Sequence, residues 1–180
     1  MRCSQGPTRP LQVQGGRVAL ADPIDFYLIH WPNPLQDKYV DTWRALIEVR
    51  ERGLVRVIGV SNFLPGHIER LEAATGVLPT VNQIESHPRF PNTGLIAYDA
   101  ERGIATEAWS PLGRDSNLLA EAVIVDVAAA HAITAAQVVL AWHVARGVTP
   151  ISKYFPLKLF MVAFWIGLPG SIKVCTICLS

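Results

Sequence analysis

The sequence predicts an α/β fold built around a parallel sheet, and three observations support this prediction. Short apolar stretches alternate about five times with segments of helical periodicity. Glycine or proline stands at most boundaries between these segments. The apolar stretches also end in polar or aromatic residues, and parallel sheets carry their ligand-contacting groups at the carboxyl ends of the strands.

The predicted strands are short, and the second is the clearest. Residues 55–60 are largely β-branched, which is typical of a strand buried on both faces of a sheet. The first is a compact apolar stretch that Pro32 stops. In chain order, strands are expected at 24–30, 55–60, 80–84, 104–109 and 148–151.

The predicted helices lie between these strands, and glycines end several of them. A capping box at Thr134–Gln137 opens the last helix, which Gly147 closes. That helix has an apolar stripe that consists of Val138, Ala141, Trp142 and Ala145. The earlier helices are expected at 41–52, 65–75, 95–102 and 118–130.

The pattern alone leaves two architectures open. A closed (β/α)8 barrel needs eight strand–helix units and roughly 250 residues. The chain has 180 residues and about five units. It is therefore either a smaller open sheet or the back portion of a barrel.

Composition excludes several classes of function. Hydrophobic residues make up 50% of the chain and charged residues 17%, which indicates a globular protein. The net charge of +1 without a basic cluster argues against nucleic acid as a partner. The sequence has no GxGxxG, P-loop or HExxH motif. Three cysteines do not make a disulfide framework, so a cytoplasmic location is expected.

No metal site and no membrane span are expected either. Cys175 and Cys178 have CxxC spacing, but no second Cys or His pair accompanies them. Residues 159–170 are a nearly charge-free run of 12, whereas a membrane-spanning helix needs about 20 residues.

The predicted strand ends have a coherent chemistry. Asn62 and Gln83 offer paired amide donors and acceptors that suit a planar carboxamide. Trp109 offers a flat face to an aromatic ring. The small-residue turn at 110–113 can bring backbone N–H groups to a phosphate, and Lys153 supplies a positive charge.

A simpler interpretation exists for Ser61 and Asn62. Either side chain can cap the helix that begins near Pro65, and capping is commoner than ligand binding. The recurrence of polar strand ends along the chain favours a ligand site instead.

Five motifs, in this order and spacing, resemble those of the aldo-keto reductase family from about Asp25 to Lys153. They are LIHWP (28–32), GLVRVIGVSNF (53–63), VNQIESHP (81–88), EAWSPLG (107–113) and AQVVLAWHVARG (136–147).

The resemblance implies both a fold and an activity. The fold would be the C-terminal part of a (β/α)8 TIM barrel, with about five of its eight βα units. The activity would be the NADPH-dependent reduction of an aldehyde or ketone to an alcohol by hydride transfer, with a small-molecule carbonyl substrate. The full-length protein would be a monomer.

The resemblance also implies roles for individual residues. His30 would orient the substrate carbonyl, and Trp31 would line the substrate pocket. The nicotinamide carboxamide would be held by Ser61, Asn62 and Gln83, and the nicotinamide ring would stack on Trp109. The cofactor's phosphates would contact Ser110, Pro111, Leu112, Gly113 and, at the 2′-phosphate, Lys153.

Both ends of the sequence depart from the family pattern. The family's proton-donating tyrosine and its supporting aspartate and lysine come from the first βα units, and residues 1–22 match none of these motifs. We expect an irregular leader at 1–22, a partial barrel at 23–153 and a divergent hydrophobic tail at 154–180. We interpret the tail as a shifted reading frame or a chance extension.

The lack of a match to the family's tyrosine, aspartate and lysine leaves an alternative function. General acid catalysis contributes about 10²–10⁴-fold to a rate. Without its tyrosine the chain would be a catalytically inactive fragment or a residual nicotinamide-binding module.

Overall fold

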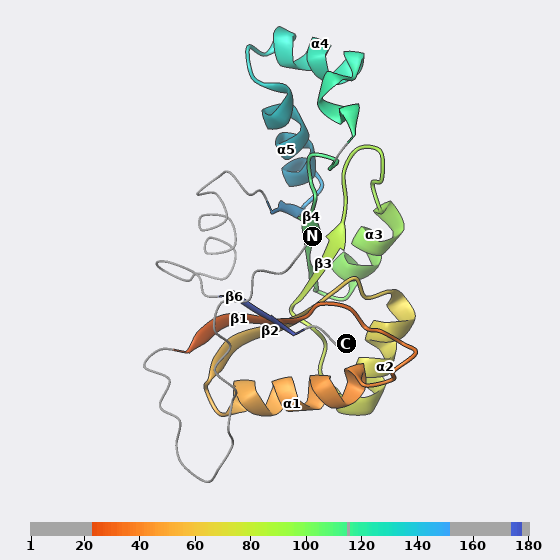
Figure 1. The fold of residues 1–180 in the computed structure, drawn as a ribbon, viewed down its shortest axis with the longest axis vertical. Helices are drawn as coiled ribbons and strands as arrows, with labels where there is room; N and C mark the ends of the chain where they lie inside the picture. The colour runs from red at the N-terminus through yellow and green to blue at the C-terminus, as the bar shows by residue number, and fades with distance from the viewer. Residues whose placement is uncertain (1–22, 115, 152–173, 178–180) are drawn as a thin grey trace.

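A computed structural model describes residues 23–114, 116–151 and 174–177 of the chain (Figure 1). The predicted leader, most of the predicted tail and Lys153 lie outside the described residues.

Strand and helix alternate as predicted, and the five expected strands are all present. The strands are β1 (Ile24–Ile29), β2 (Val55–Ser61), β3 (Val81–Glu85), β4 (Ala105–Trp109), β5 (Thr149–Pro150) and β6 (Val174–Ile177). The helices are α1 (Tyr39–Glu51), α2 (Pro65–Thr75), α3 (Thr93–Glu101), α4 (Ala122–Ala130) and α5 (Ala135–Ala145), with a 3₁₀ turn η1 (Asn117–Ala120).

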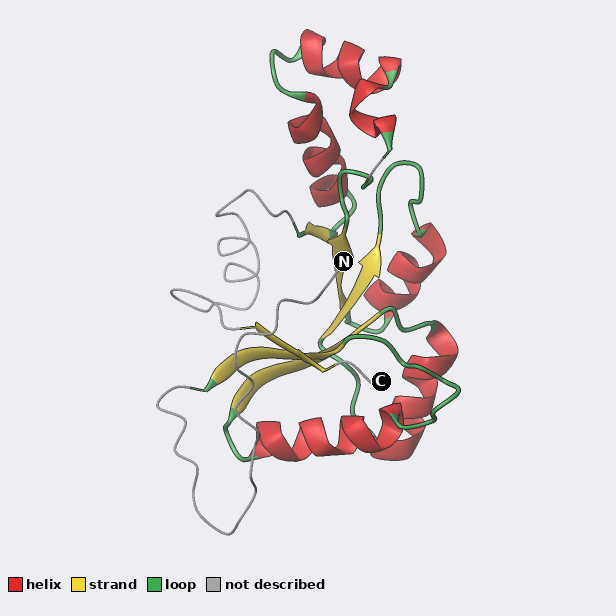
Figure 2. Ribbon diagram, viewed as in Figure 1, coloured by secondary structure: helices red, strands yellow, loops and turns green. Residues whose placement is uncertain are grey.

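The strands form one sheet in the order β5-β4-β3-β2-β1-β6, and every pairing is parallel. Strands β1 to β5 therefore follow one another across the sheet in chain order. Figure 2 shows the strong twist between the β1–β2 end and the β4–β5 end. Helices α1, α2 and α3 lie along one side of the sheet, while η1, α4 and α5 extend beyond the β4 end (Figure 1).

The main core lies between β1, β2 and the helices α1 and α2. Trp43 is fully buried there, and its indole N–H donates to the Val77 carbonyl oxygen at 3.0 Å. From α2, Ile68 and Leu71 are fully buried in the same cluster. This packing fixes the β1 and β2 strands from the helix side.

Strand β6 was not predicted. Residues 174–177, which we assigned to a divergent tail, pair in parallel with β1. The sequence does not reveal this strand because only four residues pair, and their short apolar run has no alternation or turn signal that marks a strand.

The helix predicted at 118–130 is in fact interrupted. The chain is extended at Glu121 (φ −64°, ψ 133°), which separates η1 from α4. The Glu121 carboxylate binds Arg89, a residue of the segment between β3 and α3. Apolar composition reveals neither this break nor the ion pair with a distant segment that accompanies it.

The stripe predicted on the last helix is wrong, although its capping box is confirmed. The Gln137 N–H donates to Thr134 Oγ1 at 3.2 Å, and the Thr134 N–H donates to Gln137 Oε1 at 2.9 Å. The buried residues of α5 are Val139 and His143, whereas Ala141 is exposed. A nearly all-apolar helix does not show by sequence which face it buries.

Within the described residues, no single helix is long and apolar enough to cross a membrane. Helices α4 and α5 together have the length and apolar composition of a membrane-spanning helix, but the chain bends by 93° between them.

A carboxyl group is buried where α3 meets the sheet. Asp99 is fully buried, and it accepts hydrogen bonds from Asn82 Nδ2 at 3.3 Å and from Thr106 Oγ1 at 3.1 Å. Burial raises the pKa of Asp99 to about 7, although these two hydrogen bonds act in the opposite direction.

The raised pKa of Asp99 predicts a pH-dependent stability. Between about pH 4 and pH 7 the folded chain keeps a proton that the unfolded chain releases, so the free energy of unfolding should fall as the pH rises through this window. The substitution Asp99→Asn should flatten the fall, and Asp126→Asn, at an exposed position of α4, is the control. Urea unfolding at a series of pH values measures the slope, and an unchanged slope in Asp99→Asn would contradict the assignment.

A second prediction concerns the close approach of β1 and β3 to β2. A Cβ atom at Gly59 would lie 2.8 Å from Leu28 Cδ2 and 2.8 Å from the Val81 carbonyl oxygen. Because the backbone oxygen has little room to move, Gly59→Ala should lower the free energy of unfolding by about 1–3 kcal/mol. The control is Gly66→Ala in α2, where a Cβ meets nothing within 4 Å. Equal stability of the two variants in urea unfolding would show that the sheet is looser than described.

Candidate functional site

The carboxyl ends of four adjacent strands meet at one edge of the sheet. Ser61 ends β2 and Trp109 ends β4, while His30 follows β1 directly. The register pairs Ser61 with Gln83 of β3, and Gln83 with Glu107 of β4. Parallel pairing therefore brings together residues that lie far apart in the sequence.

Asn62 connects these strand ends through its side chain and its backbone. Its Nδ2 donates to the His30 carbonyl oxygen and to Ser61 Oγ, both at 3.0 Å. Its Oδ1 accepts a hydrogen bond of 2.8 Å from Trp109 Nε1. The Asn62 backbone N–H donates to the Gln83 carbonyl oxygen at 2.9 Å. Its φ of 61° is in the left-handed region, which asparagine tolerates better than most residues.

Ser61 and Gln83 complete the cluster. The Ser61 hydroxyl donates to the Gln83 carbonyl oxygen at 2.8 Å, and Gln83 Nε2 donates to Glu107 Oε2 at 3.0 Å. That bond uses one of the two N–H groups of the Gln83 amide. The half-buried Gln83 side chain thus presents a second N–H and a carbonyl oxygen, the set that pairs with a carboxamide.

The capping interpretation of Ser61 and Asn62 is wrong. Helix α2 begins at Pro65, and its N-cap is Leu64. The Leu64 N–H donates to His67 Nδ1 at 3.2 Å, so the start of α2 is capped from within the helix.

Helix α5 contacts the turn at 110–113 through a hydrogen bond. Ser110 and Gly113 have positive φ angles of 49° and 65°, and the Gly113 N–H donates to the Ser110 carbonyl oxygen at 2.9 Å. His143 Nε2 lies 3.1 Å from the Pro111 carbonyl oxygen. Burial lowers the pKa of His143, so the neutral ring donates its Nε2–H to this oxygen.

His143 is a positioning residue whose partner the sequence analysis missed. A histidine on an apolar helix has no sequence signal that identifies its partner. A buried polar side chain does, however, need a hydrogen bond, and Pro111 provides it 32 residues away.

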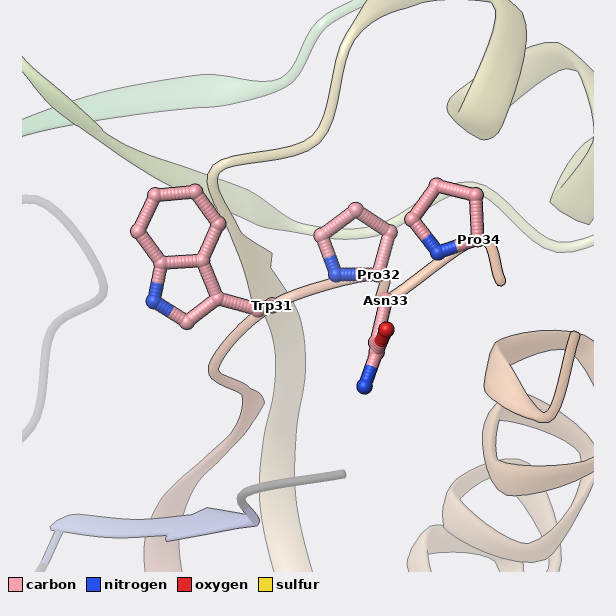
Figure 3. Close-up of a pocket in the computed structure, with 4 residues that line it drawn as sticks. All are labelled: Trp31, Pro32, Asn33 and Pro34. Atoms are coloured by element: carbon pink, nitrogen blue, oxygen red, sulfur yellow. The ribbon is translucent and has the colours of Figure 1, made fainter. Parts of the chain in front are cut away.

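His30 and Trp31 stand at the other side of the site. Their ring centroids lie 6.2 Å apart, and Trp31 is 50% exposed. Trp31 to Pro34 line an open pocket of about 370 Å³, which is at the small end of the range for small-molecule sites. Figure 3 shows the Pro32 and Pro34 rings on one side of this loop and the Asn33 amide on the other.

A comparison with family models places this geometry in a known family. The model of the Aldo/keto reductase family matches residues 16–158, which is most of the chain. The chain belongs to this family.

Relatives of known name or structure agree with the family assignment. The chain is 53% identical over 132 residues to 2,5-diketo-D-gluconic acid reductase B of Corynebacterium sp., covering 73% of this chain and 48% of that protein. It is 44% identical over 133 residues to methylglyoxal reductase DkgA of Escherichia coli, with the same two coverages. A crystal structure of a Gox0644 variant in complex with NADPH is 43% identical with a TM-score of 0.71, covering 83% of this chain and 55% of that one.

Membership of the aldo/keto reductase family decides between the two architectures. The described sheet is part of a (β/α)8 barrel, as the motifs predicted, and β1 to β5 supply about five of its units. The chain spans about half the length of the curated relatives it matches.

The hydrogen bond from Trp109 to Asn62 leads to a testable prediction. Trp109→Phe keeps an aromatic face but removes the N–H that orients the Asn62 amide. The free energy of unfolding should fall by about 0.5–1.5 kcal/mol. Trp31→Phe, at an exposed ring, is the control and should change the stability less. Urea unfolding measures both, and a Trp109→Phe variant as stable as the wild type would contradict the described network.

Proposed function

We propose that the protein is an NADPH-dependent reductase of small aldehydes or ketones, and that this chain supplies the active-site histidine and much of the cofactor site. The observation that carries the proposal is the cluster of Ser61, Asn62, Gln83 and Trp109 at adjoining strand ends, with His30 on the next strand.

The residues at the strand ends fit a nicotinamide. A carboxamide has two N–H groups and a carbonyl oxygen, and it needs both acceptors and donors in one plane. Gln83 offers one of each, and Ser61 Oγ and Asn62 Oδ1 have further lone pairs beside the bonds they already make. Because Trp109 is held by Asn62, its ring has a fixed orientation for stacking.

The turn at 110–113 fits the phosphates of the cofactor. In this proposal Leu112 offers its backbone N–H to a phosphate oxygen, since Pro111 has no N–H and the Gly113 N–H is bound to the Ser110 carbonyl oxygen. His143 keeps the turn in place through Pro111. We assign Lys153 to the 2′-phosphate, from the sequence alone.

NADPH supplies the hydride when it is bound. In the proposal, His30 donates a hydrogen bond to the substrate carbonyl oxygen and thereby sets which carbon faces the cofactor. Trp31 covers the substrate from the pocket side, where it also excludes water.

The named relatives indicate a substrate class. One reduces 2,5-diketo-D-gluconic acid and another methylglyoxal, judging by their names, and both compounds are small dicarbonyls. We propose that this protein also acts on a small carbonyl compound. We further propose a cytoplasmic protein, because its three cysteines do not make a disulfide framework, and a monomer, as the family resemblance implies.

A second candidate is a nicotinamide-binding half-site without turnover. Its support is the placement of the three tyrosines in the described part of the chain, of which Tyr27 lies within β1. Tyr39 packs against the Phe63 and His67 rings, and the Tyr98 hydroxyl donates to the Pro65 carbonyl oxygen. Both phenols are thus engaged in contacts with α2 and the residues beside it.

Cofactor titration and turnover together test the proposal. Gln83→Leu should weaken NADPH binding by about tenfold, because it removes the amide that pairs with the carboxamide. Tryptophan fluorescence measures the affinity, and absorbance at the nicotinamide band measures turnover with methylglyoxal. His30→Phe should leave NADPH affinity nearly unchanged and lower kcat/KM by about 10²-fold or more.

The control for both variants is Arg44→Met, on the exposed face of α1. Saturable NADPH binding with turnover supports the reductase, and binding without turnover supports the half-site. Absence of saturable binding, or equal affinity in Gln83→Leu, would contradict both candidates.

A further inference from the structure

The loop of residues 31–38 carries the pocket and connects β1 to α1. It is built from tight turns, with the Gln36 N–H bound to the Asn33 carbonyl oxygen at 3.0 Å and the Asp37 N–H bound to the Pro34 carbonyl oxygen at 3.2 Å. Leu35, at the tip, is 99% exposed. These bonds shape the loop itself, but they do not decide where it lies relative to the strand ends.

Arg70 of α2 holds the end of this loop by two contacts. Its Nη1 lies 2.6 Å from Asp37 Oδ1, and its Nη2 donates to Asp37 Oδ2 at 2.9 Å. One hydrogen bond and a second close ionic contact join this guanidinium and carboxylate, and two points of contact fix orientation as well as distance. Asp37 itself has a positive φ of 53°, so its backbone is placed for this contact.

Arg70 is in turn anchored on buried aromatic rings. Its guanidinium carbon lies 5.2 Å from the ring centroid of Tyr39, and its Nη1 donates to the Tyr39 hydroxyl at 3.4 Å. The Tyr39 ring is buried and packs edge-on against Phe63 and His67. The Arg70 guanidinium, which binds the loop of residues 31–38, is thus packed on the aromatic rings beside the end of β2.

The charges at this contact are stable near neutral pH. The hydrogen bond from Arg70 lowers the pKa of Asp37, so the carboxylate stays ionised when the solution is mildly acidic. Arg70 and Asp37 are both about half exposed, and such pairs add little to global stability. Their effect is therefore on the position of the loop rather than on the stability of the fold.

We propose that Arg70 is a positioning residue for substrate binding: its two-pronged contact with Asp37 fixes the loop of residues 31–38 and thereby the place of Trp31 over the substrate. This inference rests on the reductase function proposed above. According to this inference, a residue of α2 influences the KM for the substrate.

Digestion with a lysine-specific protease tests the loop contact without any activity. Lys38 is the only lysine among residues 1–152, and it is exposed at the end of the loop. The substitution Arg70→Met keeps an aliphatic side chain and removes the guanidinium. The substitution Asp37→Asn removes the charge and keeps a residue type that tolerates the positive φ at this position. Both should speed cleavage after Lys38 by about two- to fivefold, because the loop opens more often without this contact.

The matched control is Arg44→Met, which removes the exposed Arg44–Asp41 pair at 2.7 Å within α1. Cleavage after Lys38 should stay at the wild-type rate in this variant. Added salt should speed cleavage in the wild type and have less effect in the Arg70 and Asp37 variants, since it screens a contact they lack. Thermal unfolding near the wild-type midpoint verifies that each variant folds.

Steady-state kinetics with methylglyoxal and NADPH tests the effect on substrate. Both loop variants should raise KM by about three- to tenfold and change kcat less, since the loop adds binding rather than chemistry. Wild-type cleavage rates in both variants would overturn the inference, as would a loss in kcat with KM unchanged. A wild-type chain without turnover counts against the reductase proposal alone, and cleavage after Lys38 then decides the role of Arg70.

Discussion

The side-chain amide of Asn62 makes the contacts on which the candidate site depends. It donates to the carbonyl oxygen of His30 and accepts from the indole of Trp109, while its backbone N–H binds the carbonyl oxygen of Gln83. Strands β1, β3 and β4 are thereby tied to the end of β2. Parallel pairing brings these ends to one edge of the sheet, and the amide fixes how their side chains are oriented there.

Side chains of two helices contact the two loops of the site. His143 of α5 donates to the carbonyl oxygen of Pro111 and holds the turn at 110–113. Arg70 of α2 grips Asp37 and holds the loop that carries Trp31. Both loops at the site are therefore positioned by side chains of helices. This arrangement is consistent with α/β proteins in general, where loops carry function and the packed scaffold places them.

Much of the fold follows from local sequence, and the exceptions have physical causes. The five strands and the Thr134 capping box depend on nearby residues, and the structure confirms them. The break at Glu121, the buried face of α5 and strand β6 each involve a contact with a distant part of the chain. These contacts are with Arg89, the Pro111 carbonyl oxygen and β1, respectively. The candidate residues at the strand ends were identified because their types recur at strand ends, whereas the mutual hydrogen bonds of Asn62 and Trp109 had no sequence signal.

An NMR titration with NADPH tests the central claim most directly, namely that the strand ends form a nicotinamide site. The side-chain amide signals of Asn62 and Gln83 and the indole signal of Trp109 report on the atoms that would meet the carboxamide and the ring. The account predicts saturable shifts of these three signals, with the indole of Trp43 in the core unaffected. Saturable shifts elsewhere with the three signals unchanged would contradict it.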